Sequence, residues 1–575
     1  MPRHAGLIRK MHRMALIVAV AVAGGRLPLE AQNSIITGAL KDTAGGAVAG
    51  ALVKVSNQEP GPGFMVVSQA QGRYSTPNLL PGKYTIQAFG DKVQSAPAGP
   101  VEVRRGEQTR MDLDLNVPLQ IPPRTKRLTD DDYEKLMPES EDVGIKQIIA
   151  TDCKECHSLQ WTVSARKNRE QWRDAVLRMY NDLIGFPPRM PLWFALKDYE
   201  FTASRRQDTM LDYLAKHFGP DTPVDPRAIE PWVVRPGGPP HPNRNLPGSL
   251  LQGPASKYVV MEFALPAGAT PHDIAADSQG IAWVSESNTG MIGRFDPGSL
   301  SYTRIAVPPG KNPQLQLNAI AVDAKDRVWL ADDGPNGRLL QYDPKTREFN
   351  SYPIPEYRWP VPDSGWARIA TLRFSNGTVW GTRLTAQRIV RLDTTTGKIT
   401  ETSVPRGSMP FGLAIGGDSM IWYAAQVGNV VVRLNPATGR LTPFTVPTDR
   451  SDLHGMAADG EGNLWVAATE SGKLIKVDYR TGNLTEYSPP TENSGPYSLD
   501  ADTNRNLVWF SQIFTDRIGR FDVASKTFVE YPLASADVDV RRIEVDRSRP
   551  NRVWWSGAQS DRIGYLEVIE DDKPQ

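Results

Sequence analysis

The sequence is poor in cysteine and has no excess of charge of either sign. Only Cys153 and Cys156 occur among 575 residues, and 66 Lys and Arg balance 65 Asp and Glu to a formal net charge of +1. A near-neutral chain gives no electrostatic reason to bind nucleic acid or an anionic membrane surface, so we expect no nucleic-acid partner. Long apolar runs are missing after residue 31, and we expect no further membrane-spanning helix. At this length several hydrophobic cores, and therefore several domains, are expected.

Residues 1–31 are predicted to be a signal peptide. They begin with basic side chains, continue with the apolar run MALIVAVAVAG from Met14, and end near Ala31, which precedes the expected cleavage point. The alternative is a single membrane anchor, but the run is shorter than the roughly 20 residues that a spanning helix needs. We therefore expect a periplasmic or secreted protein with no transmembrane span after cleavage.

Helix-favouring composition is lacking as well. The 48 glycines and 48 prolines are too many for a helical bundle and predict a turn-rich, mainly β protein. Residues 33–117 alternate apolar and polar positions in short runs broken by glycine, which predicts a small β-sandwich. Their GRY and LLPGKYTI segments, with Gly72, Tyr74 and Tyr84, resemble the carboxypeptidase regulatory-like family, which implies a transthyretin-like sandwich. No catalytic constellation stands out here, and we expect a spacer or adhesion module.

Residues 257–575 are built from a repeat. Each copy places a tryptophan in an apolar strand and continues with two further strands, so that about four strands make one unit, as in a β-propeller blade. The seven tryptophans are Trp283, Trp329, Trp380, Trp422, Trp465, Trp509 and Trp554. We predict a seven-bladed β-propeller in which these side chains fill the space between blades.

The last repeat lacks its outer strand. The chain ends soon after RIGYLEVIE, the third strand of that unit, whereas KYVVMEFALP at 257–266 has the outer-strand pattern with no blade before it. We predict that this segment pairs with the last blade and closes the ring, which removes an open sheet edge.

The segments TPHDIAADSQGIAWVSE and DLHGMAADGEGNLWVAA resemble the virginiamycin B lyase (streptogramin lyase) family of seven-bladed propellers. Those lyases open the ester of a cyclic antibiotic by elimination, with a catalytic histidine and Mg²⁺ held by acidic residues at the channel mouth. The resemblance implies His272, Glu286 and His454 as candidate catalytic residues and Mg²⁺ as a cofactor. The lyases carry their two histidines on neighbouring blades, whereas His272 and His454 fall in blades one and five. Whether the chain is an enzyme therefore stays open.

One residue per blade is expected at the channel mouth, a nearly fixed distance ahead of each tryptophan. This column forms a polar, partly cationic ring that could bind a small-molecule ligand or dock a protein. A purely structural propeller, or a surface- or carbohydrate-binding scaffold, is the alternative. The column reads His272, Asn318, Arg368, Phe411, His454, Tyr497 and Arg541.

The middle of the chain changes character. Residues 118–132 form a linker rich in proline and charge, and residues 220–256 form a second, proline-rich linker. Between them, residues 133–219 repeat apolar positions with helical spacing. We predict a small all-α domain there.

This helical segment holds the CxxCH motif of Cys153, Cys156 and His157. Covalent haem needs two thiols that reach the two vinyl groups of one porphyrin, and an imidazole on the next residue as iron ligand. Three alternatives are weaker: a zinc site lacks a nearby fourth ligand, a thioredoxin-like pair lacks its βαβ context, and a CxxC disulfide would be strained. The segment resembles a monohaem cytochrome c domain.

The second axial iron ligand is expected to be a methionine, because thioether coordination stabilises reduced iron. Met179 is the first choice and Met190, on a proline-rich stretch, is the alternative. The leading prediction is thus an exported c-type cytochrome that transfers electrons to a redox partner protein or a quinone. Its propeller would bind a ligand or the redox partner, with lyase-like elimination as the alternative.

Overall fold

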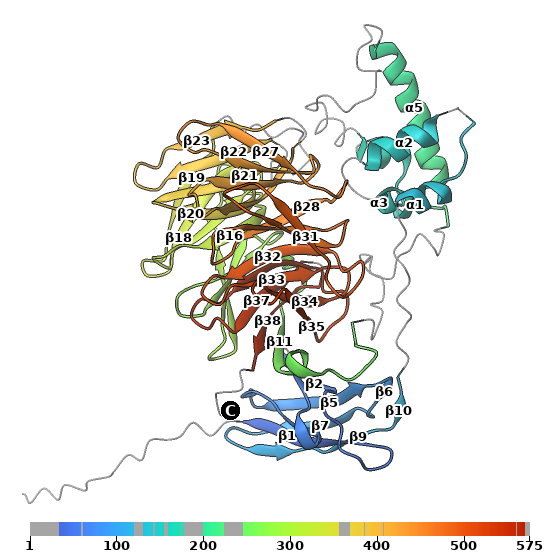
Figure 1. The fold of residues 1–575 in the computed structure, drawn as a ribbon, viewed down its shortest axis with the longest axis vertical. Helices are drawn as coiled ribbons and strands as arrows, with labels where there is room; N and C mark the ends of the chain where they lie inside the picture. The colour runs from blue at the N-terminus through green and yellow to red at the C-terminus, as the bar shows by residue number, and fades with distance from the viewer. Residues whose placement is uncertain are drawn as a thin grey trace, which may run out of the picture.

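The structure is a computed structural model that describes residues 34–58, 61–119, 130–141, 144–154, 159–173, 175–176, 199–223, 245–355, 369–384, 386–405, 408–558 and 560–569. Strands dominate both ends of the chain, and the helices lie between them in sequence (Figure 1). No helix within these ranges is long and apolar enough to cross a membrane.

The N-terminal region is a β-sandwich, as predicted for residues 33–117. One sheet has the strand order β4-β1-β8, with β9 also on β1, and the other has β10-β6-β5-β2-β3, with β7 also on β5. Alternate side chains such as Val53, Val55 and Ile86 are fully buried between the sheets. The strands are β1 (Ile35–Asp42), β2 (Leu52–Asn57), β3 (Pro62–Val67), β4 (Arg73–Ser75), β5 (Gly82–Gly90), β6 (Val93–Gln94), β7 (Ala98–Val103), β8 (Gln108–Arg110), β9 (Leu113–Leu115) and β10 (Val117–Pro118).

The GRY segment owes its glycine to close packing. Gly72 has a φ of +69°, and a Cβ there would lie 2.4 Å from the carbonyl oxygen of Leu40. Only glycine fits both constraints. Tyr74, two residues later, is buried and its hydroxyl donates to the Met111 carbonyl at 2.5 Å.

The C-terminal region forms a ring of seven four-stranded antiparallel blades, which confirms the predicted propeller. Each blade runs from an inner strand at the channel to an outer edge. In chain order the blades are β12 (Pro271–Ala276), β13 (Ala282–Glu286), β14 (Met291–Asp296), β15 (Ser301–Ala306); β16 (Leu317–Val322), β17 (Val328–Asp332), β18 (Arg338–Asp343), β19 (Glu348–Pro353); β20 (Ile369–Ser375), β21 (Thr378–Arg383), β22 (Arg388–Asp393), β23 (Ile399–Ser403); β24 (Pro410–Ile415), β25 (Ile421–Ala425), β26 (Val430–Leu434), β27 (Leu441–Thr445); β28 (Leu453–Ala458), β29 (Leu464–Ala468), β30 (Lys473–Val477), β31 (Leu484–Tyr487); β32 (Pro496–Asp502), β33 (Leu507–Gln512), β34 (Arg517–Asp522), β35 (Thr527–Pro532); and β36 (Val540–Val545), β37 (Arg552–Gly557), β38 (Arg562–Val568) with β11 (Tyr258–Ala264).

The repeated tryptophans are core residues, as expected. All seven lie on the second strand of a blade and are at most 5% exposed. In blade five, for example, Trp465 Nε1 donates to the Asp459 carboxylate at 2.9 Å, and Lys476 lies over the ring at 5.8 Å from its centroid. Packing thus fixes each tryptophan between blades and keeps it out of the channel.

The strand before the first blade closes the ring. β11 pairs antiparallel with β38 over its whole length, with Val260 opposite Leu566, which confirms the prediction for 257–266. Its other edge pairs with β3 of the sandwich, where Val260 faces Met65. Blade seven and one sandwich sheet are therefore a single ten-stranded sheet, a connection that can be followed through β2, β11 and β38 in Figure 1.

Within the predicted segment 133–219, the described residues fold mainly into helices. These helices share an apolar core that includes Tyr133, Ile149, Trp172 and Leu214. Cys153 lies in the last turn of α2, whereas the predicted haem-binding residues Cys156, His157, Met179 and Met190 lie outside the described residues. The helices are α1 (Asp130–Leu136), α2 (Ile145–Lys154), α3 (Gln160–Ser164) and α5 (Tyr199–His217).

Candidate functional site: the propeller channel

The inner strands surround a central channel that holds a cavity. Each inner strand contacts the next around the ring, and β36 returns to β12. The cavity measures about 370 Å³ together with its solvent-open part, and residues of six inner strands line it. It is the candidate site because side chains from distant repeats converge there with both charged and aromatic groups.

A β-bulge in every blade sets which side chains face the channel. The pairing between the inner strand and the second strand shifts register near its first residues in all seven blades, for example between Pro271 and Ile274. A bulge twists the strand and redirects its side chains. The predicted mouth residues His272, Asn318, Phe411, His454, Tyr497 and Arg541 all lie in these bulges.

Blade three departs from the predicted column. Its bulge lies between Ile369 and Thr371, so Ala370 occupies the position that we assigned to Arg368. Arg368 itself lies outside the described residues. The blade instead sends Arg373, two residues beyond the bulge, into the cavity.

His272 and Asp273 form a hydrogen-bonded pair at the cavity. His272 Nδ1 lies 2.8 Å from Asp273 Oδ1, and both residues line the cavity. The Asp273 side chain is 5% exposed, and its main-chain N–H donates to Ser285 Oγ at 3.1 Å. A buried carboxylate on Nδ1 orients an imidazole and stabilises its protonated form, which is the arrangement of a general base.

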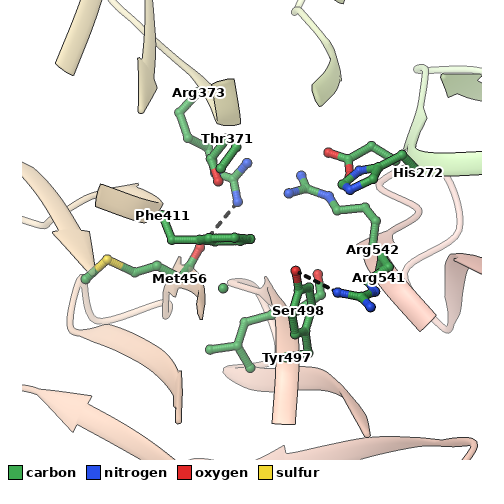
Figure 2. Close-up of a pocket in the computed structure, with 13 residues that line it drawn as sticks. His272, Thr371, Arg373, Phe411, Met456, Tyr497, Ser498, Arg541 and Arg542 are labelled. Atoms are coloured by element: carbon green, nitrogen blue, oxygen red, sulfur yellow. Dashed lines mark hydrogen bonds and ion pairs between the residues drawn. The ribbon is translucent and has the colours of Figure 1, made fainter. Parts of the chain in front are cut away.

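Arg541 faces the same cavity from blade seven (Figure 2). Its Nε lies 2.8 Å from Asp539 Oδ1, and its guanidinium carbon is 5.1 Å from the centroid of the Tyr497 ring. Burial lowers the pKa of Arg541, but Asp539 and Tyr497 together raise it overall. Arg541 is therefore a permanent cation beside an aromatic face.

Arg542, the next residue, is 8% exposed and points into the channel as well. Its Nη2 donates to Glu544 Oε2 at 3.4 Å, and the other Glu544 oxygen accepts the Ala276 main-chain N–H at 3.2 Å. Burial opposes the charge of Arg542, but the carboxylates of Asp273 and Glu544 raise its pKa. Burial also raises the pKa of Glu544, against the effect of Arg542.

Arg373 approaches from blade three and has different partners. Its Nη1 donates to the Leu372 carbonyl at 2.9 Å and its Nη2 to the Met456 carbonyl at 3.3 Å. Arg373 is partly exposed, and burial of the rest of its side chain, with the Arg542 charge, lowers its pKa to about 10. Arg373 is still protonated near neutral pH.

Aromatic side chains form one wall of the channel. The Phe411 and Tyr497 ring centroids are 5.8 Å apart, and the His454 ring packs against both, at 4.6 Å and 4.3 Å. His454 is 6% exposed and does not line the cavity. The structure thus brings His272 to the cavity and places His454 behind the aromatic wall.

Polar neighbours of both ring nitrogens also fix the position of the His454 side chain. The Thr469 hydroxyl donates to the Pro496 carbonyl and lies 2.9 Å from His454 Nδ1, so it accepts the Nδ1 proton. Gln426 Nε2 lies 3.3 Å from His454 Nε2. His454 Nδ1 also lies 3.1 Å from the Asp452 carbonyl oxygen and 3.6 Å from Asp452 Oδ2, so polar neighbours on several sides hold the ring in place.

Glu286 is held away from the channel. Its carboxylate is fully buried and accepts the Tyr302 hydroxyl at 2.9 Å, the Thr289 hydroxyl at 2.6 Å, and Nε and Nη2 of Arg304 at 2.9 and 2.5 Å. The equivalent end positions of other second strands are also paired, Asp332 with Arg338 of the third strand, and Arg383 with Glu401 and Gln512 with Glu530 of the fourth strand. This column ties strands of one blade together.

Mg²⁺, which the resemblance implied, does not fit this arrangement. Both oxygens of Glu286 are already occupied by Arg304 and two hydroxyls. Within the part of the chain that the structure describes, no three His, Cys, Asp or Glu side chains are grouped as metal ligands. Hard cations such as Mg²⁺ need several converging oxygen ligands.

Comparisons with known proteins identify the two β regions. The model of the virginiamycin B lyase family matches residues 311–572, and that of the carboxypeptidase regulatory-like domain matches residues 35–116. No curated protein matches the chain. The C-terminal region is thus a virginiamycin B lyase-like propeller. His454 falls inside the matched range, whereas His272 and Glu286 precede it.

Solved structures of such lyases are similar to about half of the chain. Selenomethionine-substituted virginiamycin B lyase from Staphylococcus aureus is 24% identical, with a TM-score of 0.48, and covers 54% of this chain and 100% of its own. A streptogramin B lyase structure is 26% identical, with a TM-score of 0.49, over 55% of this chain and 100% of its own. A catalytically inactive form of the S. aureus lyase with quinupristin is 24% identical, with a TM-score of 0.47, over 54% and 100%.

Proposed function

We propose that the propeller channel binds a small organic substrate and that His272 removes a proton from it, in a lyase-like elimination. The observation that supports this most directly is the His272–Asp273 pair at 2.8 Å on the wall of a cavity that arginines also line. The match of the propeller to the virginiamycin B lyase family gives the reaction class.

The chemistry follows from the side chains in the cavity. His272 takes a proton from a carbon next to a carbonyl, while Asp273 stabilises the resulting imidazolium. Negative charge then builds on the carbonyl oxygen, where the Arg541 guanidinium offers donors. The C–H electron pair becomes a carbon–carbon double bond, and the ester carbon–oxygen bond breaks. A carboxylate leaves with that bond's electrons, and the imidazolium returns its proton to the carboxylate or to water.

Neither Glu286 nor His454 takes part in these steps. Glu286 is occupied by Arg304, and His454 is packed behind Phe411 and Tyr497. No step uses a metal ion, since the residues present do not fit one at Glu286. The proposal thus retains His272 from the sequence prediction and adds Asp273 and Arg541.

Replacing His272 by asparagine tests this function. With quinupristin as the probe, we expect the wild-type protein to open the depsipeptide ring, which chromatography detects because the product is a linear isomer. His272→Asn should slow this reaction by roughly 100-fold or more, since it removes the general base. His454→Asn serves as the control and should stay close to the wild-type rate. Ring opening that survives in His272→Asn, or an intact ring with wild-type protein in buffers with and without Mg²⁺, would contradict the proposal.

A second function, covalent haem binding, is favoured by the CxxCH motif. We infer that Cys153 and Cys156 hold haem c through thioether bonds and that His157 is an axial iron ligand. The donor set fits, because two thiols and the adjoining imidazole are the groups that such attachment requires. Met179 or Met190 would complete the coordination. When bound, the haem would exchange single electrons with a redox partner protein or a quinone.

Removing both thiols tests haem attachment. Produced in a host that matures cytochromes c, the wild-type chain should show the added mass of one haem and a reduced-minus-oxidised spectrum of haem c. Cys153→Ala/Cys156→Ala should lose both signals while the β-rich circular dichroism of the propeller persists. A wild-type product that consists of bare polypeptide would rule out this function and leave the propeller proposal intact.

A further inference from the structure

Among the described residues, Arg373 differs from the other arginines that line the channel because no carboxylate lies within ion-pair distance of it. Arg541 is paired with Asp539, and Arg542 with Glu544. Among the described residues, the hydrogen bonds of Arg373 go to two main-chain carbonyls and none of its contacts is an ion pair. A guanidinium has five N–H donors, so three remain after these two bonds. A guanidinium with donors to spare is a suitable anchor for an anionic ligand group.

The carboxylates around Arg373 are all committed elsewhere. Asp273 binds His272, and Glu544 binds Arg542. Asp500 Oδ2 accepts the main-chain N–H of Val545 at 2.8 Å, and its Oδ1 lies 3.9 Å from Arg547. Within the described ranges, therefore, no carboxylate lies at hydrogen-bond distance from Arg373.

The cavity wall beside Arg373 is largely apolar and aromatic. Phe411, Met456 and Tyr497 line it, and Figure 2 shows the Arg373 guanidinium entering above Phe411 while His272 approaches from a different side. We infer that this part of the channel binds the carboxylate of an organic acid, with Arg373 on the carboxylate and the aromatic wall on the acid's body. The inference rests on the proposed function, since it assigns a ligand group to the same cavity as His272, and the elimination releases a carboxylate there.

A carboxylate fits this site better than a phosphate. The planar edge of a guanidinium matches the two oxygens of a carboxylate, and one positive charge balances its single negative charge. A phosphate dianion would need further uncommitted donors, whereas the neighbouring cations Arg541 and Arg542 already have carboxylate partners. The lowered pKa of Arg373 agrees, because a bound anion would offset the burial that lowers it.

Binding of benzoate to the full-length protein tests the inference. By isothermal titration calorimetry, benzoate should bind the wild-type protein, while benzamide, its neutral analogue, should bind at least tenfold more weakly. Inorganic phosphate should bind more weakly than benzoate. Equal affinity for benzamide, tighter binding of phosphate, or no binding of benzoate to wild-type protein would overturn the assignment.

Two variants of Arg373 separate charge from geometry. Arg373→Gln should weaken benzoate binding by at least tenfold, because it removes the charge. Arg373→Lys should give intermediate affinity, since it keeps the charge without the planar pair of donors, and it provides a second measurement should Arg373→Gln not fold. Arg391→Gln is the matched control, because Arg391 is exposed on β22 of the same blade, over Trp380. Unchanged affinity in Arg373→Gln would overturn the inference.

The outcome is distinguishable from failure of the elimination proposal. His272→Asn should still bind benzoate, because Arg373 is intact, while losing ring opening. Benzoate binding that depends on Arg373 without any ring opening would support the carboxylate site alone. Ring opening without Arg373-dependent binding would support the elimination alone.

Discussion

Replacing Val260 by proline should lower the free energy of unfolding by about 3 kcal/mol or more. It should also disrupt the pairing of β11 with β38 that closes the propeller ring. Val260 is fully buried in the middle of β11, between Leu566 of β38 and Met65 of β3. Proline removes a ladder hydrogen bond and clashes in a central strand, and here two sheets depend on that strand. Denaturant titration followed by tryptophan fluorescence measures the change.

Thr303→Pro is the matched control for this experiment. Thr303 is exposed in the outer strand β15, which pairs only with β14. Proline is tolerated better at a sheet edge, so the loss should be smaller and confined to one blade. Equal losses at the two positions would show that β11 has no special role in closing the ring.

Glu286→Gln should cost about 2–3 kcal/mol of stability and leave the elimination rate of the folded protein unchanged. The substitution removes the buried charge that pairs with Arg304 and accepts the Tyr302 hydroxyl. Asp332→Asn should cost a similar amount, because Asp332 pairs with Arg338 at the same place in blade two. Thermal unfolding and the quinupristin assay together measure both effects.

A catalytic Glu286 would behave in the opposite way. Activity would then fall in the folded Glu286→Gln protein, and its unfolding temperature would barely change. The double variant Glu286→Gln/Arg304→Gln adds a further check, since it removes both charges and should recover part of the lost stability. Failure to recover any stability would contradict the ion-pair role.

The repeat made the propeller predictable from sequence. One buried tryptophan per blade recurs at a nearly regular spacing. The segment at 257–266, which has the outer-strand pattern with no blade before it, predicted the strand that closes the ring. The mouth column was predictable in part: it falls in the bulges of six blades, and its members His272, Phe411, Tyr497 and Arg541 line the cavity, whereas Asn318 and His454 do not. Local periodicity carries this information, since each blade repeats the same contacts.

Two features of the site could not be predicted from one mouth residue per blade: the second cavity residue of a blade and the structural role of Glu286. A bulge turns two adjacent residues toward the channel, so Asp273 and Arg542 escaped notice beside His272 and Arg541. The structural role of Glu286 did leave a signal, because its partner Arg304 lies 18 residues later, the spacing that also separates Arg383 from Glu401 and Gln512 from Glu530. To recognise this spacing as a pairing, one must know that the third strand of a blade lies between the second and the fourth, so that long side chains of the second and fourth strands can meet across it.

The pairing of β3 with β11 left no signal at all. Both strands have an ordinary apolar pattern. Whether the edge strand of the sandwich pairs with the edge strand of the propeller depends on the shapes of two separately predicted domains. The haem prediction rests on Cys153, Cys156 and His157, and the last two of these lie outside the described residues.

The ten-stranded sheet also sets an order of events during biosynthesis. It joins the 62–67, 258–264 and 562–568 segments side by side, so the blade that contains β11 is completed only when β38 is synthesised, hundreds of residues later. Until then β11 can already rest on the sandwich, which acts as a template that keeps its hydrogen-bonding edge aligned. Contacts between residues so far apart in sequence form slowly. Pairing with the sandwich would protect one edge of β11 from aggregation until β38 has been made.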